Sequence, residues 1–298
     1  MPTYRIAAKI AGTQAAYYSR IVYRGGDLDI AAFYGCPRGE GPFPAIVYNR
    51  GGSRDFGTLK GPEIAPFVQA GYVAVASRYR GGPGSGGEDE YGGADVADVL
   101  ALLEVVAQLP EVDPDRIGMV GASRGGMMTY VALKEEALAG RHRVRAAATL
   151  GGVSDLFMWA RQRPEIAWGL FLPLIGTLPD MDPEPFRRRS ATYWPELIDC
   201  PLLLVHGEQD DQVSVDHSRT LSNLLRAAGR QVELVTFPGE GHSLAGVQRG
   251  YPAVISWLQR HLALPGEDLS YEAHADQITA AVAEVEAALG TSDGPVHI

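Results

Sequence analysis

Short apolar runs alternate with amphipathic segments along most of this 298-residue chain. Runs that are apolar on both faces are typical of strands buried in a parallel sheet. Six such runs lie at 44–49, 72–78, 116–121, 145–152, 201–207 and 232–239. Helical patterns lie between them, at about 61–70, 93–108, 124–138, 216–228 and 247–262. This alternation predicts an α/β fold with a mostly parallel central sheet flanked by helices.

Two other parts of the chain depart from this rhythm. The runs 3–10, 17–24 and 28–35 alternate apolar and polar residues, which indicates antiparallel edge strands. Residues 154–195 hold three of the four tryptophans and no strand pattern. We therefore expect a helical insertion that acts as a lid over one end of the sheet. A surface excursion with its own small aromatic core is the alternative.

The last part of the chain is a separate helical pattern. We expect one α/β domain over 1–265 and a C-terminal helical extension over 266–298. The spacing of a coiled-coil seam is present in the extension, at Ile278, Val282, Val285 and Leu289. The seam is compatible with a homodimer through this helix and equally with docking on the chain's own domain.

Composition excludes several function classes. The formal net charge of −10 argues against nucleic-acid binding and against attraction to anionic lipid. The N-terminus has no signal-peptide core, and no stretch approaches 18 consecutive apolar residues, so we expect no membrane span. Cys36 and Cys200 are too few for a disulfide framework, and we expect both to be buried. A cytoplasmic protein with a small-molecule or peptide substrate is the resulting expectation.

Candidate chemistry begins with Ser123 in "VGASRGG", at the end of an apolar run and the start of a helical one. A serine here can be a helix N-cap. It can also be a nucleophile on the strained turn of a G-x-S-x-G elbow. The motif by itself does not decide between the two.

Two other residues favour a catalytic role for Ser123. Asp210 directly follows the strand 201–207, and His242 follows the strand 232–239. Taken singly, each has an ordinary explanation, since acids and histidines are common in surface loops. Together, Ser, Asp and His follow strands in the chain order of an α/β-hydrolase triad. We therefore predict that Ser123, Asp210 and His242 form a catalytic triad.

An acyl transfer also needs donors for the developing oxyanion. The backbone N–H of Arg124 is one candidate, because it lies at the N-terminus of the helix after the elbow. The second donor is expected in the loop after the strand 44–49, from Arg50, Gly51 or Gly52.

On these residues the chain resembles the α/β-hydrolase superfamily, and more narrowly the catalytic domain of the prolyl oligopeptidase and acylaminoacyl-peptidase group, the S9 peptidases. The motifs are "GASRGG" with Ser123, "HGEQDDQV" with Asp210, "GEGHS" with His242, and "EYGGADVADV" at 90–99. The match covers roughly 28–263. The resemblance implies serine hydrolysis of peptide or ester bonds without a cofactor.

Two departures from that group bear on specificity. The position of Arg50 is often a Tyr that completes the oxyanion hole in the group, so a backbone donor from Gly51 or Gly52 is expected instead. We also expect no β-propeller of the kind that restricts access in larger members, because the 298 residues leave no room for one. Small-ester hydrolysis by a carboxylesterase is therefore the alternative activity, and a non-catalytic α/β-hydrolase-fold binding module is a remote one.

The sequence gives weak support for a dinucleotide-binding site or a metal site. Gly82, Gly84 and Gly87 match G-x-G-x-x-G, but the acids at 88–90 would repel a pyrophosphate. The seven histidines are dispersed, without metal-site spacing. We predict neither a cofactor nor a metal.

The substrate pocket is expected in the insertion, whose aromatic candidates are Trp159, Trp168, Phe171 and Tyr193. Arg50, Arg54, Arg124 and the arginines at 187–189 could bind a substrate carboxylate or could be paired on the surface.

Overall fold

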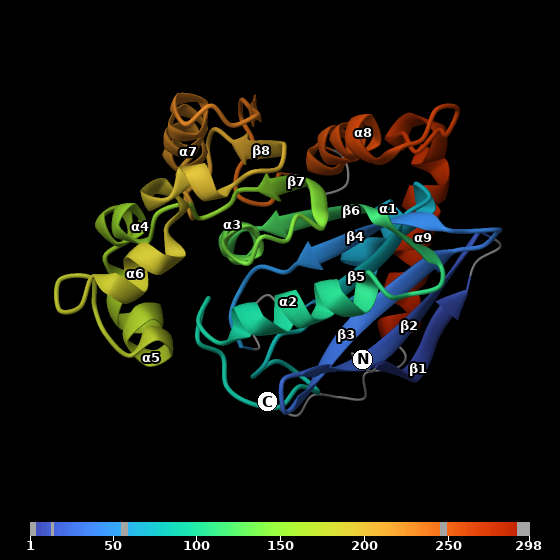
Figure 1. Cartoon of the computed structure of the whole chain (residues 1–298), viewed down its shortest axis with the longest axis horizontal. Helices are drawn as coiled ribbons and strands as arrows, with labels where there is room; N and C mark the ends of the chain where they lie inside the picture. Colours follow the sequence, from blue (N-terminus) through green and yellow to red (C-terminus); the bar gives the residue numbers. More distant parts are fainter. Residues whose placement is uncertain (1–3, 13–14, 55–58, 245–248, 291–298) are drawn as a thin grey trace.

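A computed structural model of the chain describes residues 4–12, 15–54, 59–244 and 249–290. In this part of the chain, nine strands form one sheet in the order β1-β2-β3-β5-β4-β6-β7-β8-β9 (Figure 1). The strands are β1 Tyr4–Gly12, β2 Ala16–Gly25, β3 Leu28–Pro37, β4 Phe43–Asn49, β5 Val73–Ser77, β6 Val112–Ala122, β7 Val144–Leu150, β8 Leu202–Gly207 and β9 Val232–Phe237. The first three pair antiparallel, and β4 to β9 are parallel. The predicted mostly parallel sheet with antiparallel N-terminal strands is confirmed.

The central strands are buried on both faces, which is why they appear in the sequence as continuous apolar runs. On one face, Val47, Val75 and Met119 pack with α2 (Asp95–Val106), α3 (Arg124–Leu138) and α7 (Asp216–Ala227). On the other, Ile46, Ala74 and Val120 pack with α1 (Ala65–Gln69) and α8 (Gly250–Leu262). A short 3₁₀ turn, Pro62–Ile64, precedes α1. Two cores, one on each face, therefore hold the sheet.

Strand register brings distant loops together at the carboxyl edge of the sheet. Asn49 at the end of β4 pairs with Gly121 of β6, and Gly121 pairs with Thr149 of β7. The loops after β4, β6, β7, β8 and β9 consequently leave the sheet at one edge, where open parallel sheets build their sites.

The segment 154–195 is helical. Its elements are α4 Leu156–Gln162, the π-helical turn Ala167–Phe171, α5 Leu172–Ile175, α6 Glu184–Arg189 and two 3₁₀ turns, Ala191–Tyr193 and Pro195–Leu197. In Figure 1, α4, α5 and α6 form a group beside one end of the sheet. Phe171 and Phe186 are fully buried within this group. Its role as a lid stays a prediction.

The last described helix, α9 (Tyr271–Gly290), lies along α1 and β1. Ile278 and Val285, two of the four seam positions, are buried in the same core as Phe67 of α1. These two side chains are thus already covered by the chain itself. A homodimer through α9 stays a prediction, and it would have to use the remaining surface of the helix.

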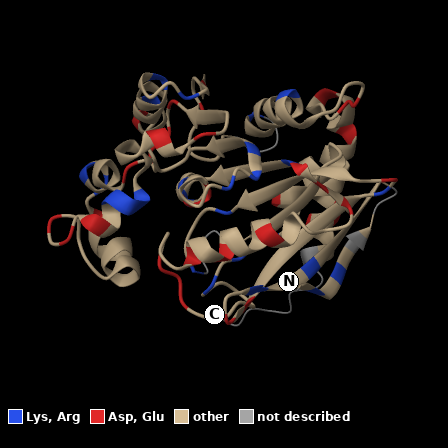
Figure 2. Ribbon diagram, viewed as in Figure 1, with Lys and Arg blue, Asp and Glu red and all other residues tan. Residues whose placement is uncertain are grey.

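Charged residues lie mainly on helices and loops. Figure 2 shows acidic residues along α2 and basic residues on α6. Both cysteines, Cys36 and Cys200, are free thiols and buried, as expected. Over the described residues, no helix is both long and apolar enough to cross a membrane.

Candidate functional site

Ser123 lies on a sharp turn between β6 and α3. Its φ of 54° and ψ of −120° place it in a region that non-glycine residues rarely adopt. Its side chain makes no capping hydrogen bond, so the N-cap reading of Ser123 does not hold in this structure. A Cβ on Gly125 would lie 1.9 Å from the carbonyl oxygen of Asn49, and one on Gly121 would lie 2.1 Å from that of Gly125. The two glycines therefore permit the close backbone contacts of this turn.

The structure brings Ser123, His242 and Asp210 together. His242 Nε2 lies 3.0 Å from Ser123 Oγ, and its Nδ1 lies 2.7 Å from Asp210 Oδ2. In the chain, Ser123 precedes His242 by 119 positions and Asp210 precedes it by 32 positions. The relay needed for proton transfer from the serine is thus present as a chain of hydrogen bonds.

The Asp210 carboxylate is held by its own loop as well as by His242. Its Oδ1 accepts from the backbone N–H of Gln212, at 2.9 Å, and of Val213, at 2.8 Å. Burial alone would raise the pKa of Asp210, but hydrogen bonds from His206, His242 and Val213 hold it well below its ordinary value. Asp210 is consequently ionised at neutral pH.

His206 is a part of this site that our reading of the sequence missed. It is fully buried, and its Nε2 lies 2.7 Å from the carbonyl oxygen of Val213 and 3.3 Å from Asp210 Oδ2. Since a carbonyl oxygen only accepts, Nε2 carries the proton. His206 therefore braces the Asp210 loop. Its position as the first residue of "HGEQD" was the available signal.

The loop after β4 lies next to Ser123. A Cβ built on Gly51 would lie 3.2 Å from Ser123 Cβ, so the two backbones are in close contact. The Arg50 side chain is directed elsewhere: it is buried, donates to the carbonyl oxygens of Gly51 and Arg78, and lies over the ring of Tyr79. The backbone of this loop, not the Arg50 guanidinium, is thus beside the serine.

The Arg124 side chain is also internal. It is 1% exposed and pairs with Asp89 through two hydrogen bonds of 2.6 Å, and with Asp95. Burial would lower the Arg124 pKa, but Asp95 and Asp89 raise it. Arg189 likewise donates to the carbonyl oxygens of Tyr91 and Glu90. These guanidinium groups bind the protein itself, so binding of a substrate carboxylate by Arg50, Arg124 or Arg189 has no support here.

A cavity of about 190 Å³ opens beside Ser123. Its lining consists of Tyr48, Ala122, Ser123, Leu150, His242, Ser243, Leu244 and Tyr251. Sequence reasoning assigned the substrate pocket to the insertion and did not select Tyr48, Leu150, Leu244 or Tyr251. No spacing rule connects these residues, because they come from four separate elements and loops.

The four aromatic residues predicted to bind substrate do not line that cavity. Phe171 is fully buried among Trp159 and Phe186, where it has no surface for a substrate. Trp159 donates from Nε1 to the carbonyl oxygen of Gln212 at 2.8 Å, close to Asp210. Trp168 and Tyr193 are exposed. Substrate contact by Trp159, Trp168 or Tyr193 stays a prediction.

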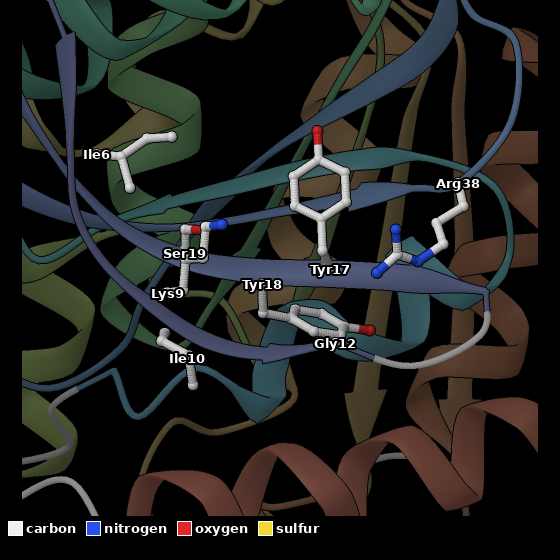
Figure 3. Close-up of a pocket in the computed structure, with 8 residues that line it drawn as sticks. All are labelled: Ile6, Lys9, Ile10, Gly12, Tyr17, Tyr18, Ser19 and Arg38. Carbon is white, nitrogen blue, oxygen red and sulfur yellow. The ribbon is translucent and has the colours of Figure 1, made fainter.

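A larger cavity, of about 500 Å³, lies at the β1–β2 edge of the sheet (Figure 3). Its lining includes Lys9, Tyr17, Tyr18 and Arg38, but none of the residues around Ser123. It lies apart from the hydrogen-bonded Ser123, His242 and Asp210, so size alone does not make it the reactive site.

Neither a metal site nor a dinucleotide-binding site has support in the described part of the chain. No group of three or more His, Cys, Asp or Glu is arranged there to hold a metal ion. The glycine-rich run 81–87 lies in the loop after β5, and α2 begins only at Asp95, so no helix N-terminus follows the third glycine directly. The geometry of a dinucleotide fingerprint is therefore missing at this place.

Comparison with known proteins agrees with this picture. Residues 59–264 match the prolyl oligopeptidase family. The uncharacterized peptidase YtmA of Bacillus subtilis is 30% identical over 213 residues, which are 72% of this chain and 81% of that protein. Other curated relatives match over 33–35% of their own length, so the chain spans about a third of them.

Solved structures give the same result. A puromycin-hydrolyzing peptidase of Mycobacterium tuberculosis is 25% identical, with a TM-score of 0.68, over 79% of this chain and 38% of that one. Acetyl xylan esterase 1 of Thermoanaerobacterium sp. is 20% identical, with a TM-score of 0.66 over 89% of each chain, which shows the shared fold. With its α/β-hydrolase fold and a family match over more than half of its length, the chain belongs to the prolyl oligopeptidase family and is a serine hydrolase.

Proposed function

We propose that the chain cleaves peptide bonds of small substrates through an acyl-enzyme on Ser123. The observation that carries the proposal is the position of His242, which lies 3.0 Å from Ser123 Oγ through Nε2 and 2.7 Å from Asp210 Oδ2 through Nδ1. The relatives named above include peptidases, which supports the same bond type.

The reaction follows from these contacts. Ser123 Oγ attacks the substrate carbonyl carbon as its proton passes to His242 Nε2. Asp210, ionised, accepts the Nδ1 hydrogen bond and stabilises the imidazolium. The backbone N–H of Arg124 at the start of α3 and those of the Gly51–Gly52 loop stabilise the oxyanion. His242 then protonates the leaving amine, and water hydrolyses the acyl-enzyme.

Hydrolysis of small acyl esters is the second candidate. The cavity beside Ser123 is about 190 Å³, below the roughly 300–1,000 Å³ of pockets that bind drug-sized ligands, and leucines and tyrosines make up half of its lining. A short acyl group fits such a space better than a large side chain. This limit on size favours acetyl over longer esters.

A substrate panel with a serine control tests both candidates. Purified protein is assayed with aminoacyl-p-nitroanilides and with p-nitrophenyl esters of two to eight carbons. Ser123→Ala should lower turnover by about 10⁴-fold or more. Ser222→Ala, which removes another buried serine hydroxyl, should leave turnover unchanged. Undiminished activity in Ser123→Ala would refute the nucleophile.

The panel also separates the bond types. Cleavage of the anilides supports the peptidase. Turnover confined to the two- to four-carbon esters, with no anilide cleaved, contradicts the peptidase and supports the esterase.

A further inference from the structure

The backbone of the loop after β4 is held by hydrogen bonds from buried side chains. Three successive carbonyl oxygens accept side-chain hydrogen bonds: Arg50 O from Tyr79 Oη at 3.3 Å, Gly51 O from Arg50 Nη1 at 2.9 Å, and Gly52 O from Arg124 Nη1 at 3.0 Å. All three carbonyls therefore face one cluster of buried cationic and phenolic groups.

These hydrogen bonds fix the direction of the Gly51 and Gly52 backbone N–H groups. In a trans peptide, the C=O of one residue and the N–H of the next point in opposite directions. Anchoring the Arg50 and Gly51 carbonyls in the cluster turns the N–H groups of Gly51 and Gly52 away from it. Since the backbone of Gly51 contacts Ser123, these amides are placed to join the Arg124 N–H as donors to an oxyanion formed there.

The cluster is centred on Arg124, the residue after the nucleophile. Its guanidinium lies over two rings, 5.2 Å from the centre of Tyr79 and 4.6 Å from that of Tyr91. Asp89 receives two of its hydrogen bonds and also accepts from the backbone N–H of Arg54 at 3.0 Å. The loop is thus held at Gly52 by Arg124 and at Arg54 by Asp89.

The electrostatics of this pair favour a fixed geometry. Burial opposes ionisation of Asp89, but the hydrogen bonds from Arg124 hold the Asp89 pKa below its ordinary value. Both groups are therefore charged, and a planar guanidinium in two-point contact with a carboxylate has one preferred orientation. A lysine could keep the charge, but three N–H donors on one nitrogen cannot reproduce the four hydrogen bonds that Arg124 makes with Asp89, Asp95 and Gly52 O.

We propose that Arg124, through its side chain, is the positioning residue of the oxyanion loop: with Asp89 it holds the 50–54 backbone so that the Gly51 and Gly52 amides face the reacting carbonyl. The inference rests on the proposed function. It gives one residue two roles, since the Arg124 N–H donates to the oxyanion and its side chain fixes the partner loop.

The test compares Arg124→Lys with wild type in three measurements. We expect kcat/KM for p-nitrophenyl acetate to fall about 30-fold, because small displacements of oxyanion donors are costly. Inhibition by phenylboronic acid, whose tetrahedral adduct on Ser123 mimics the oxyanion, should weaken by a similar factor. The midpoint of the acidic limb of the pH profile should not move, because His242 and Asp210 keep their contacts.

Arg143→Lys is the matched control. Arg143 also makes a two-point contact with a buried carboxylate, Glu136, with hydrogen bonds of 2.8 Å, but it precedes β7 at the opposite end of the sheet. Its kcat/KM should stay within twofold of wild type.

The outcomes are separable. If folded Arg124→Lys keeps kcat/KM and boronate affinity within twofold, the inference is overturned. A shift of the pH midpoint also overturns it, because the substitution then acts on His242 and Asp210. If Arg124→Lys does not fold, Asp89→Asn and Tyr79→Phe are judged by the same criteria, with about tenfold and threefold losses expected. Activity retained in Ser123→Ala would instead refute the proposed function.

Discussion

At the scale of single residues, glycines and one serine define the reactive turn. The motif predicted the strained position of Ser123, because only small neighbours allow it. It did not predict the role of the Arg124 side chain, since its partners Asp89 and Asp95 lie 35 and 29 residues away, beside a glycine-rich run with no periodic pattern. Contacts of this kind depend on the finished fold and leave no local signal.

Gly125→Ala should damage both stability and activity. The new methyl group would meet the Asn49 carbonyl at 1.9 Å, a backbone atom that cannot move without shifting the end of β4. Overpacking of this kind costs about 3 kcal/mol. Urea unfolding and p-nitrophenyl acetate turnover measure the two effects.

Gly169→Ala is the control for that substitution. Gly169 has open space around the position of a Cβ, so both quantities should remain near wild type. Equal behaviour of the two variants would show that the close contact at Gly125 is not needed.

At the scale of elements, the parallel strands could be predicted well and the helical insertion only in outline. Strands such as β4 and β5 are buried on both faces, so their apolar runs have one reading. The insertion contains short helical pieces whose packing depends on aromatic contacts with one another. The cavity beside Ser123 was not foreseen either, because Tyr48, Leu150, Leu244 and Tyr251 come from four separate elements and loops that only the finished fold brings together.

The α9 helix gives a prediction at this scale. Ile278 is fully buried against the domain, so Ile278→Ala should lower the free energy of unfolding by about 2–4 kcal/mol. Glu286→Ala, on an exposed position of the same helix, should have little effect. Thermal unfolding and light scattering are the measurements. A change of molar mass in Ile278→Ala without loss of stability would favour the homodimer instead.

At the scale of the whole molecule, two cores enclose the sheet and leave its carboxyl edge for chemistry. The insertion is tied to the loop before α2 by Arg189, which donates to the carbonyl oxygens of Tyr91 and Glu90, and to α3 by Lys134, which donates to the carbonyl oxygen of Arg188. Buried polar groups therefore lie both at the site and away from it, in the insertion and the helices that it contacts. Their ionisation links the stability of the entire chain to pH.

His217 provides the clearest case. Burial lowers the pKa of His217 to about 4, and its Nδ1 accepts from the backbone N–H of Ser154. The unfolded chain, with an ordinary histidine pKa of about 6.5, binds more protons between those values. Stability should thus fall as pH drops through this window, by about 2–3 kcal/mol from pH 7.5 to 4.5.

Urea unfolding at the two pH values measures this change, and His217→Asn is the control, because Asn can accept the same hydrogen bond without titrating. An equal loss in both proteins would contradict the assignment. The lowered pKa values of Asp210 and Asp89 contribute only below about pH 4, since a carboxyl group in the unfolded chain titrates there.

The arginine clamp has a further consequence for how the chain folds. Arg124 joins Gly52 and Asp89 across separations of 72 and 35 residues, and such long-range closures form late because they cost loop entropy. The oxyanion loop should therefore gain its shape only after β4, β5 and β6 have assembled. In refolding experiments, native fluorescence should return before turnover of p-nitrophenyl acetate. A chain cleaved between β5 and α2 should lose this activity while it keeps its sheet.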